Sequence, residues 1–246
     1  MVEHPLEIQG PDGVVDGLLY APEGQGPRPG VLFLTDIGGI RPATCGMARR
    51  LAGHGYVVLL PNLFYRTMRP PVFDFPLGFR DPAAQARMAE LTAPLTPEAI
   101  ARDATLYADV LAARPELRPG PLAVVGHCYS GAVALRMAAA RPDAFTAMAS
   151  FHGGRLYNDS TASPHLVLPQ VRARLYFAHA DQDGSMPAEA IAGLEAALER
   201  WGGAYESVLY VGARHGWTAP GSPVYDEAQA NRAFEALIGL LDESLG

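Results

Sequence analysis

The chain has 246 residues, of which 49% are hydrophobic and 18% charged, and its formal net charge at pH 7 is -7. Such a composition supplies a substantial apolar core and excludes a disordered chain. A negative charge without a basic run argues against a general nucleic-acid-binding protein. All 19 cationic residues are arginine, which excludes Schiff-base chemistry and a phosphate-loop lysine.

The N-terminus lacks a basic segment followed by an apolar stretch, and no run approaches the roughly 20 apolar residues that span a bilayer. We therefore expect a cytoplasmic protein without a membrane partner, in which Cys45 and Cys128 stay reduced. No repeat or low-complexity linker divides the sequence, although residues 61–97 are rich in proline and aromatic residues. This predicts one domain over residues 1–246.

In chain order, residues 14–20 follow the turn signal Pro11-Asp12-Gly13 and are predicted to pair with residues 6–8 as antiparallel strands. Short apolar runs predict buried strands at 31–35, 57–60, 122–125, 144–150, 175–179 and 207–211. Helical periodicity predicts helices at 43–54, 97–113, 130–140, 187–201 and 226–245. This alternation predicts a doubly wound α/β fold with reactive residues beyond the carboxyl ends of the strands.

The segment Gly126-His127-Cys128-Tyr129-Ser130-Gly131 lies between a predicted strand and a predicted helix. A nucleophile on such a sharp turn is held in a strained conformation with its side chain projecting outward. The helix N-terminus stabilises a thiolate, and the backbone N–H groups of Ile37 and Tyr129 are the predicted oxyanion donors. We predict Cys128 as the nucleophile; the alternative is a buried apolar side chain.

Two later strands are followed by groups that could activate this thiol. Asp181 or Asp183 follows the strand at 175–179, and His215 follows the strand at 207–211. The order nucleophile, acid, histidine is the one that α/β-hydrolases use, and it places all three on one edge of the sheet. The histidine would take the thiol proton, and the carboxylate would fix the histidine tautomer.

The remaining histidines show no metal-ligand spacing, so no metal site is predicted. His127 and His152 are candidates for the pocket lining. Phe64, Tyr65 and Trp217 are candidates for its apolar walls, with core packing or surface exposure as the alternative. No large insertion follows residue 150, which predicts a small, open site for compact substrates and no large cap domain.

The chain resembles the dienelactone hydrolase family of α/β-hydrolases over nearly its whole length. The matching segments are residues 32–39, 61–66, 126–131, 183–187 and 212–216. The resemblance implies a hydrolase without a cofactor that opens unsaturated lactones during the breakdown of aromatic compounds. It also selects Asp183 over Asp181, because the family's acid lies four residues before the proline that starts the next helix.

Three positions depart from the family pattern. Asp36 stands where the family has a glutamate that interacts with the resting thiol, so the resemblance implies that Asp36 modulates the thiol. Ser130 replaces a glycine of the family's elbow. No arginine follows His215 to hold a lactone carboxylate; Arg80 or Arg87 could resemble the family's other carboxylate contact, with simple solvation as the alternative.

These observations predict a hydrolase that cleaves a small ester or lactone through a thioester at Cys128, as a monomer or homodimer. A broad carboxylesterase, an acyltransferase or a thiol-redox enzyme on the same scaffold is the alternative. A noncatalytic binding protein is a further alternative, but it would predict a broken triad, and no triad position is broken.

Overall fold

The computed structural model describes residues 1–24, 26–75, 78 and 80–246. Within these residues, eight strands form one sheet in the order β1-β2-β4-β3-β5-β6-β7-β8. β2 is antiparallel to both of its neighbours, and the pairs from β4 to β8 are parallel. The strands are β1 (Val2–Gly10), β2 (Gly13–Ala21), β3 (Arg28–Leu34), β4 (Val57–Pro61), β5 (Leu117–His127), β6 (Phe145–Phe151), β7 (Arg174–Gln182) and β8 (Tyr205–Arg214).

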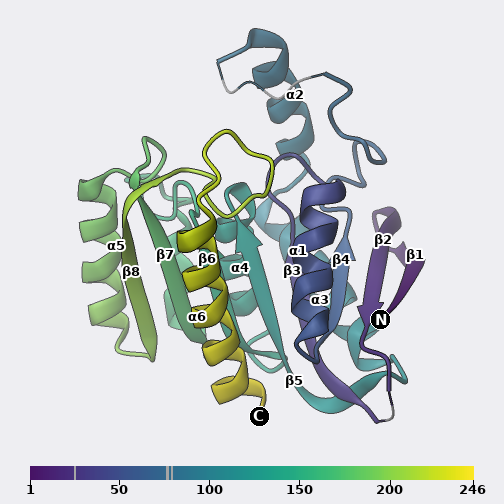
Figure 1. Cartoon of the computed structure of the whole chain (residues 1–246). Coiled ribbons are helices and arrows are strands. Elements are labelled where there is room, and N and C mark those ends of the chain that lie inside the picture. The colour runs from purple at the N-terminus through teal and green to yellow at the C-terminus, as the bar shows by residue number, and fades with distance from the viewer. Residues whose placement is uncertain (25, 76–77, 79) are drawn as a thin grey trace.

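Helices cover both faces of the sheet (Figure 1). The helices are α1 (Pro42–Gly53), α2 (Pro82–Thr92), α3 (Pro97–Ala112), α4 (Tyr129–Ala140), η1 (Pro164–Gln170, a 3-10 helix), α5 (Ala188–Trp201) and α6 (Glu227–Leu245). Buried side chains of α1 and α6 pack on one face, and those of α3, α4 and α5 pack on the other. The predicted doubly wound α/β fold is therefore confirmed.

Local signals explain why the helix boundaries were predictable. Thr96 accepts a hydrogen bond from the backbone of Ala99, and Pro97 begins α3. Asp226 caps α6 in the same way through the N–H of Gln229, at 3.0 Å. α5 ends at Gly202, whose φ of +73° suits glycine.

Two elements lie outside the prediction, and one strand differs from it. α2 and η1 are short segments with little periodicity; α2 lies within the proline-rich segment 61–97, and η1 itself contains Pro164 and Pro169. β8 was expected to be buried on both faces, but Leu209 is 44% and Val211 71% exposed. The reason is its place at the sheet edge, where it pairs with β7 alone.

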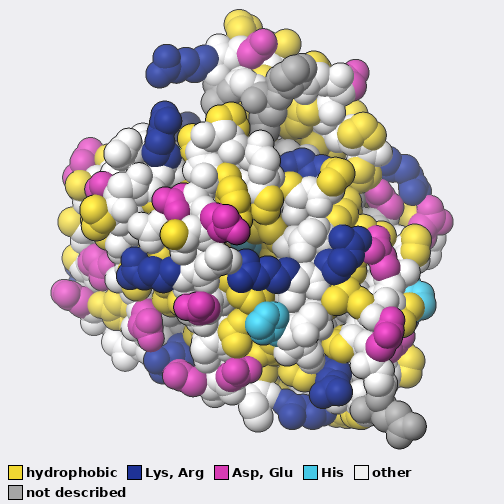
Figure 2. Space-filling view, in the orientation of Figure 1, with side chains coloured by type: hydrophobic (Ala, Val, Ile, Leu, Met, Phe, Trp, Pro, Cys, Tyr) yellow, Lys and Arg dark blue, Asp and Glu magenta, His cyan; other side chains and the backbone are white. Residues whose placement is uncertain are grey.

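The described residues contain no helix with the length and apolar character that crossing a membrane requires. On the face shown in Figure 2, arginine and acidic side chains are interspersed, and hydrophobic side chains are exposed between the α2 segment at the top and the body of the molecule.

The parallel strands bring the candidate residues to one edge of the sheet. Asp36 and Ile37 follow β3, Cys128 follows β5, Asp183 follows β7 and His215 follows β8. α2 lies beyond this edge, above the strand ends in Figure 1. Carboxyl ends of parallel strands are where open α/β sheets carry their ligand sites.

Candidate active site

Cys128 occupies the turn between β5 and α4 in a backbone conformation that is rare for a residue with a side chain. Its φ is 56° and its ψ is -121°. Its N–H donates to Phe151 O at 3.0 Å, and its C=O accepts from Gly131 N at 3.1 Å and Gly154 N at 3.3 Å. These bonds offset the strain and fix the turn to the end of β6.

The turn requires small residues on both sides of Cys128. A Cβ added at Gly126 would lie 2.2 Å from Ser130 O, and one added at Gly131 would lie 2.3 Å from Ser150 Oγ. Ser130 is fully buried, and its hydroxyl accepts from His127 N at 2.8 Å and faces Leu34 O at 3.2 Å. The serine that replaces a family glycine therefore joins the elbow to β3 rather than adding a hydroxyl to the pocket.

Cys128, His215 and Asp183 form a continuous chain of contacts. Cys128 Sγ lies 3.0 Å from His215 Nε2, and His215 Nδ1 lies 2.6 Å from Asp183 Oδ2. Asp181 is excluded from this chain because its Oδ2 accepts from Gly212 N at 3.0 Å. The geometry is that of a nucleophile, a base and the carboxylate that orients the base.

Ser185 holds the carboxylate oxygen of Asp183 that His215 does not contact, and its hydroxyl oxygen also lies 3.4 Å from His215 Nδ1. Its N–H and its hydroxyl both donate to Asp183 Oδ1, at 2.8 and 2.6 Å. Sequence reasoning missed this role, although a serine two residues after an aspartate is a signal for such a turn.

The contacts also determine the charges of the pair. Burial opposes ionisation of Asp183, but the hydrogen bonds from His215 and Ser185 dominate and lower its pKa. Burial likewise opposes a charge on His215, yet Asp183 and Cys128 raise the pKa of the imidazole to about 10. A histidine cation beside the sulfur stabilises a thiolate.

The two residues predicted to donate to an oxyanion, Ile37 and Tyr129, line the same cavity as Cys128. Tyr129 is the first residue of α4, so its N–H has no acceptor within the helix. Ile37 follows β3, and both residues line the cavity that contains Cys128. Within the described residues, neither amide donates to a backbone carbonyl outside regular elements.

Asp36, the predicted thiol modulator, lines a cavity together with Cys128, and its carboxylate is paired with Arg41. Its two carboxylate oxygens contact Arg41 Nη1 at 2.6 Å and Nη2 at 2.7 Å, and Oδ1 also accepts from Gly38 N at 2.8 Å. The aspartate side chain is one methylene shorter than glutamate, and these contacts turn it toward its own loop. Its geometry supports a role in shaping the loop that carries Ile37.

Two cavities meet at the sulfur and the imidazole. One, of about 820 Å³, lies under α2 and has mainly apolar walls. The other, of about 510 Å³, is lined by polar side chains such as Gln182 and Arg214 and by apolar ones such as Pro220 and Val224. Ile37, Cys128 and His215 line both. The larger cavity contradicts the expectation of a small site, because α2 adds a wall that the sequence did not reveal.

The aromatic residues predicted as pocket walls lie in the interior. Phe64 and Trp217 are 1% and 0% exposed, and neither lines either cavity. Tyr65 donates its hydroxyl to the buried Asp103 at 2.9 Å. The alternative of core packing therefore holds for Phe64 and Trp217, and Tyr65 is partly buried against the core.

The two arginines predicted to hold a carboxylate lie outside the cavity. Arg80 is exposed before α2. Arg87 is within α2, where it donates to Val72 O at 3.1 Å and pairs with Glu90 at 3.1 Å. The arginines that do line the large cavity are Arg136 and Arg155. Arg136 could have been found from its spacing of seven residues from Tyr129, which places both on one helix face.

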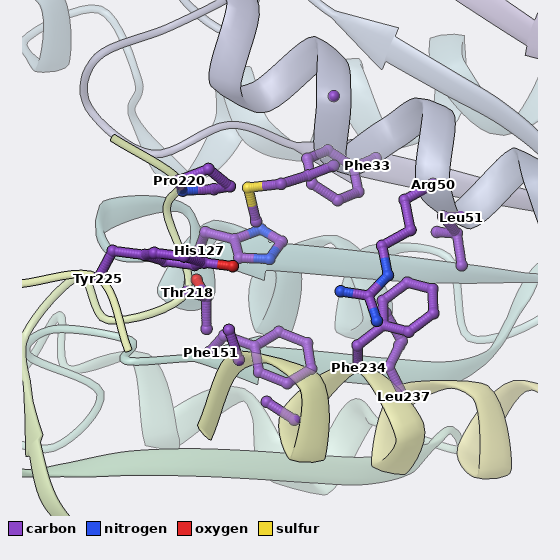
Figure 3. Close-up of a pocket in the computed structure, with 14 residues that line it drawn as sticks. Phe33, Arg50, Leu51, His127, Phe151, Thr218, Pro220, Tyr225, Phe234 and Leu237 are labelled. Atoms are coloured by element: carbon purple, nitrogen blue, oxygen red, sulfur yellow. The ribbon is translucent and has the colours of Figure 1, made fainter. Parts of the chain in front are cut away.

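His127 and His152 point into different surroundings. His127 lines a separate cavity of about 100 Å³ between α1 and α6, beside Phe33 and Phe151 (Figure 3). Burial lowers the pKa of His127 to about 4, so its ring is neutral at pH 7. His152 lines the cavity of about 510 Å³. Its ring centroid is 5.2 Å from that of His215, and its Nε2 is 2.7 Å from Thr218 Oγ1.

The described residues contain no group of three or more His, Cys, Asp or Glu side chains that could hold a metal ion.

A nucleophile elbow at the carboxyl edge of a mostly parallel, helix-covered sheet defines the class of protein as an α/β-hydrolase. The sequence matches the model described as the dienelactone hydrolase family over residues 15–245. A protein of Escherichia coli K12 named "Putative carboxymethylenebutenolidase" is 25% identical over 224 residues, which cover 88% of this chain and 77% of that protein. One of the same name from Synechocystis is 26% identical over 241 residues, covering 94% and 92%.

The fold agrees with this match. A Klebsiella pneumoniae protein named "Putative Dienelactone Hydrolase" in its crystal structure superposes with a TM-score of 0.87 and 21% identity, over 98% of each chain. The chain belongs to the dienelactone hydrolase family, and it is a hydrolase that acts on esters or lactones.

Proposed function

We propose that the chain cleaves a carboxylic ester or lactone by covalent catalysis at Cys128. The observation that carries this proposal is the 3.0 Å contact between Cys128 Sγ and His215 Nε2, continued by the 2.6 Å contact from His215 Nδ1 to Asp183. A sulfur held against a histidine that a carboxylate orients is an activated nucleophile.

In the first half of the reaction, the Cys128 thiolate attacks the substrate carbonyl carbon, and the carbonyl electrons move to oxygen. The N–H groups of Ile37 and Tyr129 stabilise this oxyanion. The tetrahedral intermediate then collapses, the carbon–oxygen bond to the alcohol breaks, and His215 donates its Nε2 proton to the departing alkoxide. A thioester on Cys128 and a free alcohol result.

In the second half, neutral His215 takes a proton from water, which attacks the thioester carbonyl. Collapse of the new intermediate releases the carboxylic acid and restores the thiolate beside the imidazolium. Asp183 keeps the Nδ1 proton of His215 in place throughout, which leaves Nε2 for proton transfer.

The test compares hydrolysis of 4-nitrophenyl acetate and a panel of lactones by wild type, Cys128→Ala and Cys45→Ser, with intact-mass detection of the acyl adduct. Cys45 is the matched control because it is the other free cysteine and lies on α1. We expect the Cys128 variant to lose at least a hundredfold in kcat/KM and the adduct, and the Cys45 variant to retain both. Full activity of Cys128→Ala would exclude the proposed nucleophile.

Acyl transfer and thiol oxidation are distinguished in the same assay. Added alcohols or amines would divert the product from acid to a new ester or amide if acyl transfer were the main reaction. A peroxide-dependent activity without ester turnover would instead indicate redox chemistry.

A further inference from the structure

The large cavity beside Cys128 has mainly apolar walls. Its volume of about 820 Å³ lies in the range of small-molecule sites. Met88 and Ala89 of α2, Ile100 of α3 and Ala132 and Val133 of α4 supply its apolar walls. A substrate of only a few heavy atoms would leave most of this apolar surface without contacts.

The guanidinium group of Arg136 lies along the same cavity wall. Arg136 is partly buried, and its Nη2 donates to Ala162 O. Within the described part of the chain, no carboxylate lies within 4.0 Å of its guanidinium. Burial lowers the pKa of Arg136, which shows that the surroundings disfavour its charge. A partly buried cation without a counter-ion gains from an anionic ligand.

The helix sets the distance between this cation and the reacting sulfur. Tyr129, Ala132, Val133 and Arg136 all line the cavity, and this spacing of three, four and seven residues is one helix face. Two turns of α4 separate Tyr129 from Arg136, which is about 10 Å along the axis. An anion at Arg136 would therefore lie several bonds away from a carbonyl at Cys128.

The second cavity suggests which half of the substrate occupies the apolar one. The alcohol leaves in the first half of the reaction, whereas the acyl group stays bound to Cys128 until water hydrolyses the thioester. The cavity with the larger apolar surface therefore suits the acyl half of the substrate, and the other cavity suits the departing alcohol. The second cavity carries Gln182 and Arg214 beside its apolar residues, and these two side chains can hydrogen-bond a departing alcohol.

Resting on the proposed cysteine hydrolase function, we propose that the preferred substrates carry an elongated apolar acyl group that ends in a carboxylate, with the apolar part under α2 and the carboxylate at Arg136. Arg155 also lines the cavity, but it is exposed, so an anion there gains less over water.

The experiment uses 4-nitrophenyl esters that share one alcohol and differ in the acyl group: acetate, hexanoate, octanoate, and the monoesters of adipic and suberic acid. The last two match hexanoate and octanoate in length and add the terminal carboxylate. They are assayed with wild type, Arg136→Met, Arg136→Lys and Arg155→Met. Arg200→Met is the control, because Arg200 is an exposed arginine at the end of α5.

We expect Arg136→Met to lower kcat/KM for the carboxylate-ended esters about ten- to hundredfold and to change the neutral esters less than threefold. Arg136→Lys should retain part of the preference, and Arg155→Met and Arg200→Met should retain most of it. Ala132→Phe, which narrows the cavity, should lower the ratio of octanoate to acetate activity about tenfold or more, whereas Ala140→Phe on the exposed end of α4 should leave this ratio unchanged.

Failure of the inference and failure of the proposed function give different results. If wild type hydrolyses acetate through Cys128 but gains nothing from chain length or a terminal carboxylate, the substrate proposal is overturned and the hydrolase remains. The same holds if Arg136→Met lowers all esters equally. If wild type hydrolyses none of the esters and forms no acyl adduct, the proposed function itself is overturned.

Discussion

Asp36 and Arg41 form a two-point ion pair, with Oδ1 2.6 Å from Nη1 and Oδ2 2.7 Å from Nη2. The same arginine also donates to Gly39 O at 3.2 Å, so the pair closes the loop that begins after β3. Ile37, whose amide is a proposed oxyanion donor, lies within this loop. The pair therefore bears on the oxyanion site through the backbone.

Asp36→Asn and Arg41→Met are each expected to lower kcat by about tenfold, because either change loosens the loop around the Ile37 amide. The double variant should be no worse than the singles, since both changes remove one interaction. Steady-state kinetics with one aryl ester give kcat for wild type, the two single variants and the double variant. If Asp36 acted directly on the thiol, Arg41→Met would free its carboxylate and raise activity while Asp36→Asn alone lowered it.

Ser185→Ala is expected to lower kcat about tenfold with little change in unfolding temperature. The change removes the 2.6 Å hydroxyl bond to Asp183 but keeps the 2.8 Å amide bond, so the carboxylate stays near His215 in a looser orientation. Ser160→Ala, in an exposed loop, is the control. Unchanged kcat in Ser185→Ala would mean that the amide alone orients the acid.

The fold was predictable because the hydrophobic pattern and the local signals agree along most of the chain. The residues of β3 from Gly30 to Leu34 and all of β4 are buried, and α3 and α6 begin within one residue of their predicted starts. α2 was missed because it has only Ala84 and Leu91 buried and lies inside a proline-rich segment. Its position depends on contacts that no short pattern specifies.

The candidate site was predictable where chemistry depends on chain order and strand ends, as for Cys128 and His215. It was not predictable where the direction of a side chain decides whether the residue lines the cavity or packs in the core, because that direction depends on tertiary packing. Trp217 is two residues after His215 and yet fully buried against Tyr210 and His152, at 5.0 Å from each ring centroid. Arg136 lies in a helix for which the sequence predicted no contact with a substrate. The cavity beside Arg136 has residues of α2 as one of its walls, and α2 was not predicted.

His179→Phe is expected to make the protein less sensitive to acid. His179 is buried on β7 with Nε2 unpaired within the described residues, and burial lowers its pKa to about 4. Folding therefore favours the neutral form of His179. The neutral side chain leaves the free energy of unfolding at its full value above about pH 6.5, and this free energy decreases as the pH falls toward 4. Replacement by phenylalanine keeps the ring beside Phe177 and removes this titration.

Urea unfolding at pH 7.5 and 4.5 measures the effect. Wild type should lose roughly 2–3 kcal/mol more than the phenylalanine variant between these pH values. His4→Phe, at an exposed position of β1, should leave the wild-type pH dependence unchanged. Equal losses in wild type and His179→Phe would mean that His179 gains protons without a penalty in the folded state.

Asp183→Asn is expected to shift the alkaline limb of the pH–activity profile to lower pH. The pKa of His215 is raised to about 10, so the imidazolium that protonates the leaving alcohol persists up to that pH and is lost above it. The contacts that raise this pKa also stabilise the folded protein. Their contribution to the free energy of unfolding is fully present below about pH 6.5 and is lost as the pH rises through 10. Without the carboxylate, the histidine loses its proton nearer its ordinary pKa.

The profile of kcat/KM between pH 6 and 10.5 measures this shift, and Asp181→Asn is the matched control. Asp181 is two residues away at the end of the same strand, and its carboxylate accepts from Gly212 N at 3.0 Å. We expect a shift of at least one pH unit in Asp183→Asn and none in Asp181→Asn. A wild-type alkaline limb in Asp183→Asn would show that the Asp183–His215 contact does not hold the catalytic proton, and the role given to the carboxylate would have to be withdrawn.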